Sequence, residues 1–482
     1  MPKPLRRILK ELQNIVGEAN VLHHPEDLLV FEYDGSIDRA IPESVIFPAT
    51  TEEVSKVVAL AYREAIPVVG RGSGTGLSGG AIASMGGIQL VLTRMKRILE
   101  LDAENRLAVV EPGVINLDLD HAAGQRGLRY APDPSSQKAC SIGGNIGENA
   151  GGPHCLAYGV TTNHVLGLEA VLEDGSVKWL GGKTQDIPGY DLRGVFIGSE
   201  GTFGIATKIV VRLLPVPESV KTLLGVFPDV DSACNTVSSV IGQGIVPAAM
   251  EIIDAVAIRA ILNVTKDIFP SDAGSVLLVE VEGLEEEVEE LSGQVESLMR
   301  DAGAMDVRIA VEPEERERLW AARKGAFGAL GTLAPNYYLV DGVVPRTRLT
   351  ETLGKVAEIS QRFGLLVANV FHAGDGNLHP CIAFDEREPG ATDTVIEAGE
   401  EMLKVCVEMG GTLTGEHGVG LEKKAYMPLI FTREDMDTMV GVRDAFSAST
   451  LFNPGKIFPG GPGYDRTIQG RAVSNVGPGA HI

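Results

Sequence analysis

Two short segments of the C-terminal half carry three of the nine histidines of the chain. The first, Phe-His-Ala-Gly-Asp-Gly-Asn-Leu-His, holds His372 and His379, and the second, Gly-Glu-His-Gly-Val-Gly, holds Glu416 and His417. Two imidazoles and the Glu416 carboxylate suit Zn²⁺ or another divalent ion with a position open for substrate. His417 would then be free as a general base, because imidazole titrates near neutral pH. The alternative is a set of loop histidines satisfied by hydrogen bonds, since this spacing is not diagnostic of a metal.

Both segments are predicted to be loops beside apolar strands, where functional groups concentrate. The chain before them alternates apolar runs with segments of helical period, in the order strand 223–227, helix 230–242, strand 249–253, strand 276–281, helix 284–302 and strand 307–311. This β-α-β-β-α-β order is typical of a ferredoxin-like α+β domain. We expect that domain to span 218–450, after a first domain at 1–217. The five glutamates of 285–290 are expected on a solvated helix start.

The first half begins with a predicted strand–helix–strand unit: an apolar run at 45–47, a helix capped by Thr50 or Thr51, and a strand at 66–69. Eight glycines follow within 70–87. They include a literal G-x-G-x-x-G, but the glycine content after it opposes the helix that a Rossmann site requires. The alternatives are a loop that binds phosphate through its backbone N–H groups and a set of tight turns.

Composition excludes several classes of function. The length of 482 residues favours two or more domains. The 42 Lys and Arg against 65 Asp and Glu give a net charge of −23, which repels nucleic acid and anionic membranes. Apolar runs are too short for a membrane span, so we expect a cytoplasmic protein whose N-terminal 16 residues form an amphipathic helix. The five cysteines form no C-x-x-C pair, so iron–sulfur chemistry would belong to a partner.

Five ordered segments of the first half carry a family resemblance. They are Pro-Val-Val-Gly-Arg-Gly-Ser-Gly-Thr-Gly at 67–76, Ala-Pro-Asp-Pro at 131–134, Ser-Ile-Gly-Gly-Asn at 141–145, Ala-Gly-Gly at 150–152 and Gly-Ser-Glu-Gly-Thr-Phe-Gly-Ile at 198–205. Their order and spacing resemble the FAD-binding domain of the vanillyl-alcohol oxidase / p-cresol methylhydroxylase family. The resemblance implies an α+β domain whose two subdomains enclose FAD.

The same resemblance implies which residues bind the cofactor. They are Arg71, Gly72, Ser73, Gly74, Thr75, Gly76, Pro132, Asp133, Ser141, Gly143, Gly144, Asn149, Ala150, Gly151, Glu200, Gly201, Ile205 and Asn453. Members that attach the flavin covalently tend to place a histidine in the first loop, where this chain has Thr75. The resemblance therefore implies FAD held without a covalent bond.

The histidine segments, together with Leu-Trp-Ala-Ala-Arg-Lys at 319–324 and Asn-Pro-Gly-Lys at 453–456, resemble the C-terminal domain of the FAD-linked 2-hydroxyacid dehydrogenases. That group includes D-lactate dehydrogenases and glycolate oxidase FAD subunits. The resemblance implies that His372, His379 and Glu416 hold a divalent metal, Zn or Mn, and that His417 is the base. It also implies that Arg323 binds the substrate carboxylate and that His372 is a second substrate-binding residue. The segment 451–482 would return to the first domain and end in a loose tail.

Two positions differ from the pattern of the 2-hydroxyglutarate enzymes and indicate the substrate class. Leu339 and Cys381 stand where the 2-hydroxyglutarate enzymes carry a polar Lys and Asn, which favours a small acid such as glycolate or D-lactate. Hydride would pass to the flavin, and electrons onward to a quinone, an iron–sulfur protein or an electron-transferring flavoprotein. A homodimer is possible, as is peripheral membrane association through a partner. The alternatives are D-2-hydroxyglutarate dehydrogenase, an aryl-alcohol or alditol oxidase, a non-catalytic flavin subunit and a structural protein.

Overall fold

The chain divides into two compact units in a computed structural model that describes residues 3–185 and 188–460. The first unit consists of the described parts of Met1–Ala150, Val160–Pro215 and Glu416–Ile482, and the second of Gly151–Gly159 and Val216–Gly415. The backbone therefore passes between the units four times. The tail that we expect to be loose after residue 460 lies outside the described residues.

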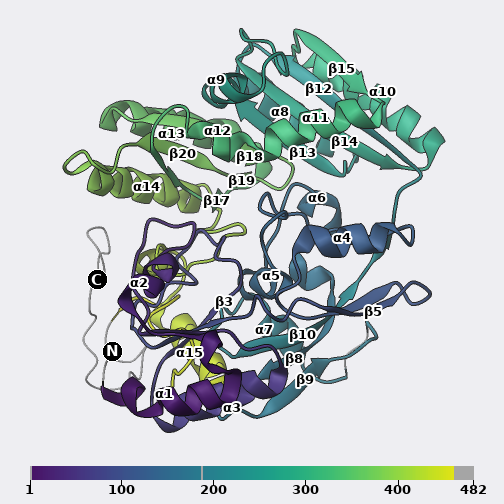
Figure 1. Cartoon of the computed structure of the whole chain (residues 1–482). Helices are drawn as coiled ribbons and strands as arrows, with labels where there is room; N and C mark the ends of the chain where they lie inside the picture. Colours follow the sequence, from purple (N-terminus) through teal and green to yellow (C-terminus); the bar gives the residue numbers. More distant parts are fainter. Residues whose placement is uncertain (1–2, 186–187, 461–482) are drawn as a thin grey trace. The chain divides into compact units, whose positions relative to one another are not determined.

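The first unit contains two larger sheets and a two-stranded ribbon (Figure 1). The four-stranded sheet has the order β1 (Val21–Leu22), β2 (Ser44–Ile46), β4 (Ile88–Val91), β3 (Val68–Arg71). The five-stranded antiparallel sheet has the order β5 (Ile98–Asp102), β6 (Leu107–Val110), β10 (Ile205–Arg212), β8 (Val165–Val171), β9 (Val177–Gly181). The ribbon pairs β11 (Leu214–Pro215) with β7 (Leu128–Arg129). The helices of the first unit are α1 (Lys3–Val16), α2 (Pro25–Leu28), α3 (Thr51–Arg63), α4 (Asn116–Gly124), α5 (Ile142–Glu148), α7 (Leu192–Phe196) and α15 (Arg433–Phe446). It also has 3-10 turns at Glu18–Asn20, Leu29–Phe31, Thr161–Asn163 and Lys424–Leu429.

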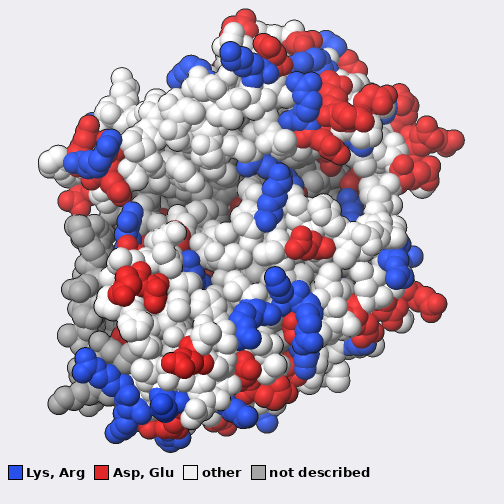
Figure 2. All heavy atoms as spheres, in the orientation of Figure 1, with Lys and Arg blue, Asp and Glu red and all other residues white. Residues whose placement is uncertain are grey.

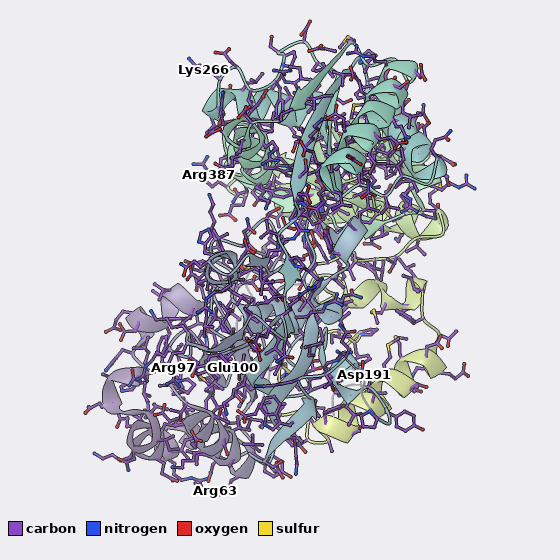
Figure 3. The ribbon with its side chains drawn as sticks, turned by 90° about the vertical axis from the view of Figure 1, so that its right-hand side faces the viewer. Arg63, Arg97, Glu100, Asp191, Lys266 and Arg387 are labelled. Carbon is purple, nitrogen blue, oxygen red and sulfur yellow. The ribbon has the colours of Figure 1, made fainter. Side chains whose placement is uncertain are left out.

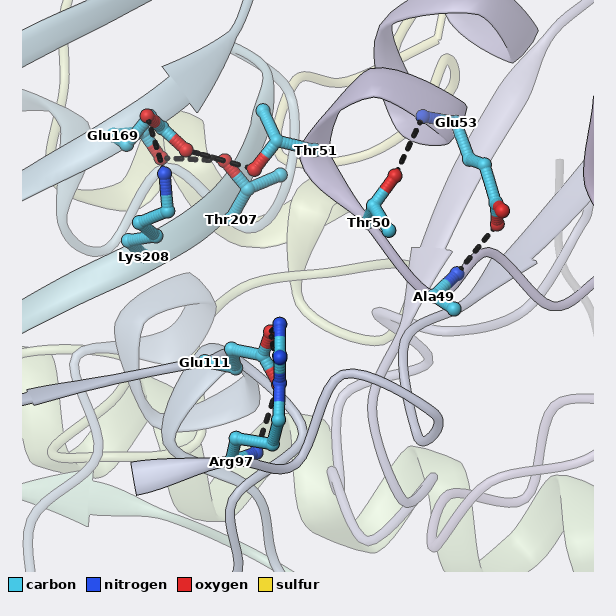
Figure 4. Close-up of polar contacts among 9 residues, drawn as sticks. All are labelled: Ala49, Thr50, Thr51, Glu53, Arg97, Glu111, Glu169, Thr207 and Lys208. Atoms are coloured by element: carbon cyan, nitrogen blue, oxygen red, sulfur yellow. Dashed lines mark hydrogen bonds and ion pairs between the residues drawn. The ribbon is translucent and has the colours of Figure 1, made fainter. Parts of the chain in front are cut away.

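Helix α3 joins the two sheets of this unit. Thr50 caps it by accepting a hydrogen bond from the Glu53 N–H at 3.2 Å, and the Glu53 carboxylate accepts one from the Ala49 N–H at 2.7 Å (Figure 4). Its buried residues Val54, Val57, Val58 and Ala61 recur with helical period. They share a core with residues of α1 and of both sheets. The predicted strand–helix–strand unit is therefore confirmed.

A buried carboxylate fastens the five-stranded sheet to the start of α3. Glu169 accepts hydrogen bonds from the hydroxyls of Thr51 at 2.8 Å and Thr207 at 3.0 Å, and pairs with Lys208 at 3.0 Å (Figure 4). These partners satisfy a charge that would be costly to bury alone. The unit also carries acidic residues nearer its surface: Asp191, at the start of α7, is exposed, and Glu100 on β5 is partly exposed (Figure 3).

The second unit is built on a nine-stranded sheet. Its first four strands have the order β15 (Asp306–Ala310), β12 (Ser219–Phe227), β14 (Ser275–Gly283), β13 (Ala249–Asp254), all antiparallel. The sheet continues through β18 (Leu366–His372), β19 (Asn377–Leu378) and β17 (Gly342–Val343), while β20 (Pro380–Phe384) pairs with β18 and with β16 (Asn336–Leu339). The helices are α6 (Cys155–Tyr158), α8 (Val230–Gly242), α9 (Ala255–Val264), α10 (Glu285–Asp301), α11 (Pro313–Lys324), α12 (Ala326–Leu330), α13 (Leu349–Phe363) and α14 (Ala391–Glu408), with a 3-10 turn at Arg346–Arg348.

The predicted β-α-β-β-α-β order is confirmed for β12 to β15. Helices α8 and α10 pack their apolar residues, including Val237 and Val295, against Leu223 and Leu277 of the sheet. The predicted order omits α9, which follows β13. The glutamates that begin α10 are exposed, as expected, and acidic side chains gather over this helix in the space-filling view (Figure 2). Over residues 3–185 and 188–460, no helix has the length and apolar character needed to cross a membrane.

Candidate functional site

The first glycine-rich loop follows β3 and passes against the start of α5. Arg71 ends β3 with its guanidinium buried, where it donates to the Tyr33 carbonyl at 2.8 Å, and burial lowers the pKa of Arg71. A Cβ on Gly72 would collide with Ser141 Oγ, and Gly74 has a left-handed φ of +72°. A side chain at Gly76 would meet nothing within 4 Å. The loop thus needs glycine for close approach at one end and leaves open space at the other.

The second glycine cluster forms a short helix, α5, rather than a loop alone. Ser141 caps it by accepting a hydrogen bond from the Gly144 N–H at 3.3 Å. Gly143 donates its N–H to the Pro112 carbonyl at 2.7 Å, and a Cβ on Gly143 would lie 2.6 Å from Pro112 Cβ. The helix ends at Asn149, a left-handed residue with φ of 53°. Glycine here allows the helix to approach the neighbouring backbone.

The remaining segments expected to bind FAD converge on α5. The N–H of Glu200 donates to the Gly147 carbonyl at 2.8 Å, and Asn453 Nδ2 donates to the Glu200 carbonyl at 2.7 Å. Pro132 accepts a hydrogen bond at 3.0 Å from the amide of Asn116, whose own N–H bonds to the Cys140 carbonyl at 3.0 Å. The other members belong to the same unit, namely Ser73, Thr75, Asp133, Ala150, Gly201 and Ile205, whereas Gly151 begins the segment assigned to the second unit.

A buried charged cluster lies under these loops. Lys456 Nζ donates to the carbonyls of Gly79 at 2.7 Å, Gly80 at 3.1 Å and Ile82 at 2.8 Å, and burial lowers the pKa of Lys456 to about 8. Burial also raises the pKa of Glu148, helped by the neighbouring Glu200. The bonds of Lys456 thus tie the C-terminal segment to the first glycine-rich loop. No role for Glu148 or Lys456 was predicted from the sequence.

Glu200 also holds the loop that carries His417. Its carboxylate accepts hydrogen bonds from the N–H groups of Val419 at 2.7 Å and Gly420 at 2.6 Å. His417 Nε2 lies 3.9 Å from the carboxylate of Glu416 within this segment. The loop predicted at 415–420 is confirmed, and its backbone is anchored two and three residues beyond the histidine.

Arg323 is a fully buried guanidinium in the second unit. It projects from α11, and its Nε and Nη2 lie 2.7 and 2.5 Å from Glu251 Oε2. Glu251 lies on β13 and is also fully buried. Among the described residues, Arg323 Nη1 has no hydrogen-bond partner. Glu251 therefore neutralises the charge of the guanidinium from one side, and the N–H groups of Nη1 remain as donors for another acceptor.

His372 and His379 lie close together, with ring centroids 5.1 Å apart. The Nδ1 of His372 lies 2.7 Å from Glu251 Oε1, and the Nδ1 of His379 lies 3.8 Å from Asp341 Oδ1. The bond from His372 to Glu251 leaves Nε2 of His372 available, which is typical of metal-ligating histidines, whereas 3.8 Å is too long for a hydrogen bond between His379 and Asp341. The expectation of a loop is corrected here, because His372 ends β18 and His379 stands between β19 and β20.

The residues predicted to bind a metal and to act as the base are divided between the two units at the bond from Gly415 to Glu416. Asp341 accepts hydrogen bonds from the Thr414 hydroxyl at 2.6 Å and the Gly415 N–H at 3.1 Å. The next residues, Glu416 and His417, belong to the first unit. Sequence reasoning missed both Glu251 and Asp341; the available signal was a single carboxylate within or directly after an apolar strand.

Comparison with known proteins identifies the family. A model of the FAD binding domain matches residues 42–181, and one of the C-terminal domain of FAD linked oxidases matches residues 216–457. The glycolate oxidase subunit GlcD of Escherichia coli K12 is 44% identical over 453 residues, which cover 94% of this chain and 91% of that protein. The chain belongs to the FAD-linked oxidases. Its expected FAD-binding domain is thereby confirmed.

Two further comparisons extend this result. The D-lactate dehydrogenase of Archaeoglobus fulgidus is 34% identical to this FAD-linked oxidase, over 86% of this chain and 90% of that protein. A solved structure of p-cresol methylhydroxylase with substrate bound superposes with a TM-score of 0.81 at 17% identity, over 95% of this chain and 97% of that one. The latter confirms the predicted α+β fold of the p-cresol methylhydroxylase type.

Proposed function

We propose that this FAD-linked oxidase oxidises a small 2-hydroxy acid, glycolate or D-lactate, to the 2-oxo acid. The observation that carries the proposal is the buried Arg323, whose Nη1 has no acceptor among the described residues. A substrate carboxylate would satisfy this donor by a charge-assisted hydrogen bond. Relatives named glycolate oxidase subunit and D-lactate dehydrogenase support the same substrate class.

The chain's own residues have separate tasks in this reaction. Arg323 binds the carboxylate and so orients the α-carbon. His417 takes the proton of the α-hydroxyl at an imidazole nitrogen, and Glu200 holds its loop in place. Bound FAD supplies the hydride acceptor. The open space at Gly76 and the loops gathered on α5 fit such a cofactor, and Thr75 offers no ring nitrogen for a covalent bond.

We assign a divalent metal, Zn or Mn, to His372, His379 and Glu416. The orientation of His372 fits, because its Nδ1 is hydrogen-bonded to the buried Glu251 carboxylate, and the His379 ring lies 5.1 Å from that of His372. Glu416 follows Gly415, whose backbone is fixed on Asp341. A metal at these residues would act as a Lewis acid on the substrate hydroxyl.

By the predicted domains, residues 1–217, with 451–482, would hold FAD, and 218–450 would bind the substrate. The compact units differ from this division, because residues 416–450 belong to the first unit and 151–159 to the second. The electron acceptor would be a quinone, an iron–sulfur protein or an electron-transferring flavoprotein, and the word subunit in the names of relatives supports a protein partner. We place the enzyme in the cytoplasm, as a possible homodimer, with membrane association only through its partner.

Anaerobic bleaching of the yellow protein, substrate by substrate, tests this function. Glycolate or D-lactate should reduce the flavin, and metal analysis of active protein should find about one equivalent. Chelation should suppress the reduction while the flavin stays bound. A yellow protein that no 2-hydroxy acid bleaches would instead be a non-catalytic flavin subunit. Faster bleaching by D-2-hydroxyglutarate would favour that dehydrogenase.

A further inference from the structure

We propose that Glu251 is a positioning residue that fixes the tautomer of His372 and, with its second oxygen, the orientation of Arg323. One carboxylate would thus couple the metal site to the substrate-binding arginine. The inference rests on the proposed function, since it assumes that His372 binds a metal and that Arg323 binds the substrate.

The position of Glu251 in the sheet supports this role. Glu251 and His372 are direct partners across β13 and β18. The carboxylate is fully buried and divides its two oxygens, Oε1 to His372 Nδ1 at 2.7 Å and Oε2 to Arg323 Nε at 2.7 Å. The three side chains come from two neighbouring strands and from α11. The rigid sheet therefore holds the carboxylate between the two functional groups.

The chemistry of a carboxylate explains why position 251 suits a glutamate and not a glutamine. An ionised carboxylate only accepts hydrogen bonds, so the proton of a neutral His372 must lie on Nδ1. Nε2 is then left with a lone pair, the form that a metal requires. A glutamine has one acceptor oxygen and one NH₂ group. If its oxygen serves Arg323, its NH₂ faces His372 and favours the tautomer with the proton on Nε2.

A purely structural ion pair predicts a different result. Loss of the Glu251 charge would then lower the stability of the protein without a specific effect on the metal. Glu280 provides the matched control, because it is another buried glutamate of the same sheet, on β14. It accepts a hydrogen bond from Trp320 Nε1 at 2.6 Å and pairs with His154 at 3.0 Å.

The experiment titrates metal-free, FAD-loaded protein with Mn²⁺ and follows the loss of the free-ion EPR signal. Glu251→Gln should weaken Mn²⁺ binding about 10- to 100-fold. Glu280→Gln should leave it within about twofold of wild type. Equal Mn²⁺ affinity in wild type and Glu251→Gln would overturn the inference alone. A wild type that binds no Mn²⁺ and no Zn²⁺ would overturn the metal assignment of the proposed function as well.

A second measurement needs no folded Glu251 variant. Nitrogen-15 NMR of histidine-labelled, metal-free wild type distinguishes the two neutral tautomers, with the His372 signals assigned by their loss in His372→Asn. We expect the proton on Nδ1. A proton on Nε2 would contradict the proposed role of Glu251.

Discussion

Leu339 and Cys381 are directly paired across β16 and β20, and both side chains are buried. Burial raises the pKa of the Cys381 thiol, although the positive charge of Arg323 acts on it in the opposite direction. The thiol therefore stays neutral beside the proposed substrate-binding arginine. Neither member of the pair offers a cation or an amide to a second substrate carboxylate.

This pair predicts a preference for short substrates. A distal carboxylate would meet apolar atoms, so kcat/KM for D-2-hydroxyglutarate should be at least roughly tenfold below that for glycolate or D-lactate. Steady-state assays with an artificial electron acceptor measure the ratio. Leu339→Lys should narrow it, while Leu366→Lys, at an exposed position on β18, should not. A wild type that prefers D-2-hydroxyglutarate would refute the size argument and leave the flavoenzyme class intact.

FAD should leave the protein intact on acid precipitation. Thr75 occupies the first loop and has no nucleophilic ring nitrogen, so nothing at this position can form the covalent bond. Absorbance of the supernatant at the flavin bands, compared with the total before precipitation, measures the released fraction. Flavin that stays with the pellet would contradict the non-covalent site.

His417→Asn should slow flavin reduction by roughly 10² to 10⁴, because the amide replaces the base with a group of similar size. Anaerobic stopped-flow reduction isolates this step. His24→Asn, at an exposed position outside the loop, is the control and should reduce at the wild-type rate. If the His417 variant is slowed only a few-fold, the base is another residue.

Arg323→Ala should lower kcat/KM for glycolate or D-lactate by about 30-fold to several thousand-fold, the usual effect of truncating one partner of a buried charge pair. Arg323→Lys should recover only part of this loss, since an ammonium lacks the planar fork. Arg318→Ala tests for general damage to α11, where that residue is exposed. Near-normal rates in Arg323→Ala would move the carboxylate site elsewhere.

His164 should make the protein less stable at mildly acidic pH. Burial, with the charges of Arg212 and Arg129, lowers the pKa of His164 from 6.5 to about 4. The unfolded chain binds the proton more readily, so stability falls as the pH drops from about 6.5 to 4, by roughly 3 kcal/mol. Urea unfolding at pH 7.5 and 4.5 should show a smaller difference for His164→Asn than for wild type. Equal differences in the two proteins would exclude this histidine as the cause.

Much of the fold was predictable, because the periodicity of the apolar residues and the order of the elements indicate the same domain type. The run from β12 to β15 alternates cleanly between strand and helix, so its order and the ferredoxin-like sheet followed. Helix α5 was not predictable, because three of its seven residues are glycines, which have low helix propensity. The Ser141 cap and the burial of Ile142 and Ile146 in the core stabilise it instead.

The site residues that belong to short sequence motifs were predictable. Arg323, His372 and His379 stood out by motif, and the structure brings Arg323 and His372 together on the Glu251 carboxylate, with His379 beside His372. Glu251 did not stand out, because it lies 72 residues from Arg323 and 121 from His372 in the chain. Only the pairing of β13 with β18 makes it a neighbour, and strand pairing over such distances is a property of the folded sheet.

The bonds from Lys456 to the carbonyls of the first glycine loop can form only late in the synthesis of the chain. Lys456 and Gly79 are 377 positions apart. At about 5 to 20 residues per second, the ribosome adds that lysine roughly 20 to 75 s after the loop it satisfies. During this interval the three loop carbonyls cannot yet accept hydrogen bonds from Lys456. The first glycine loop thus gains these hydrogen bonds only near the end of translation, although its own residues are among the earliest made.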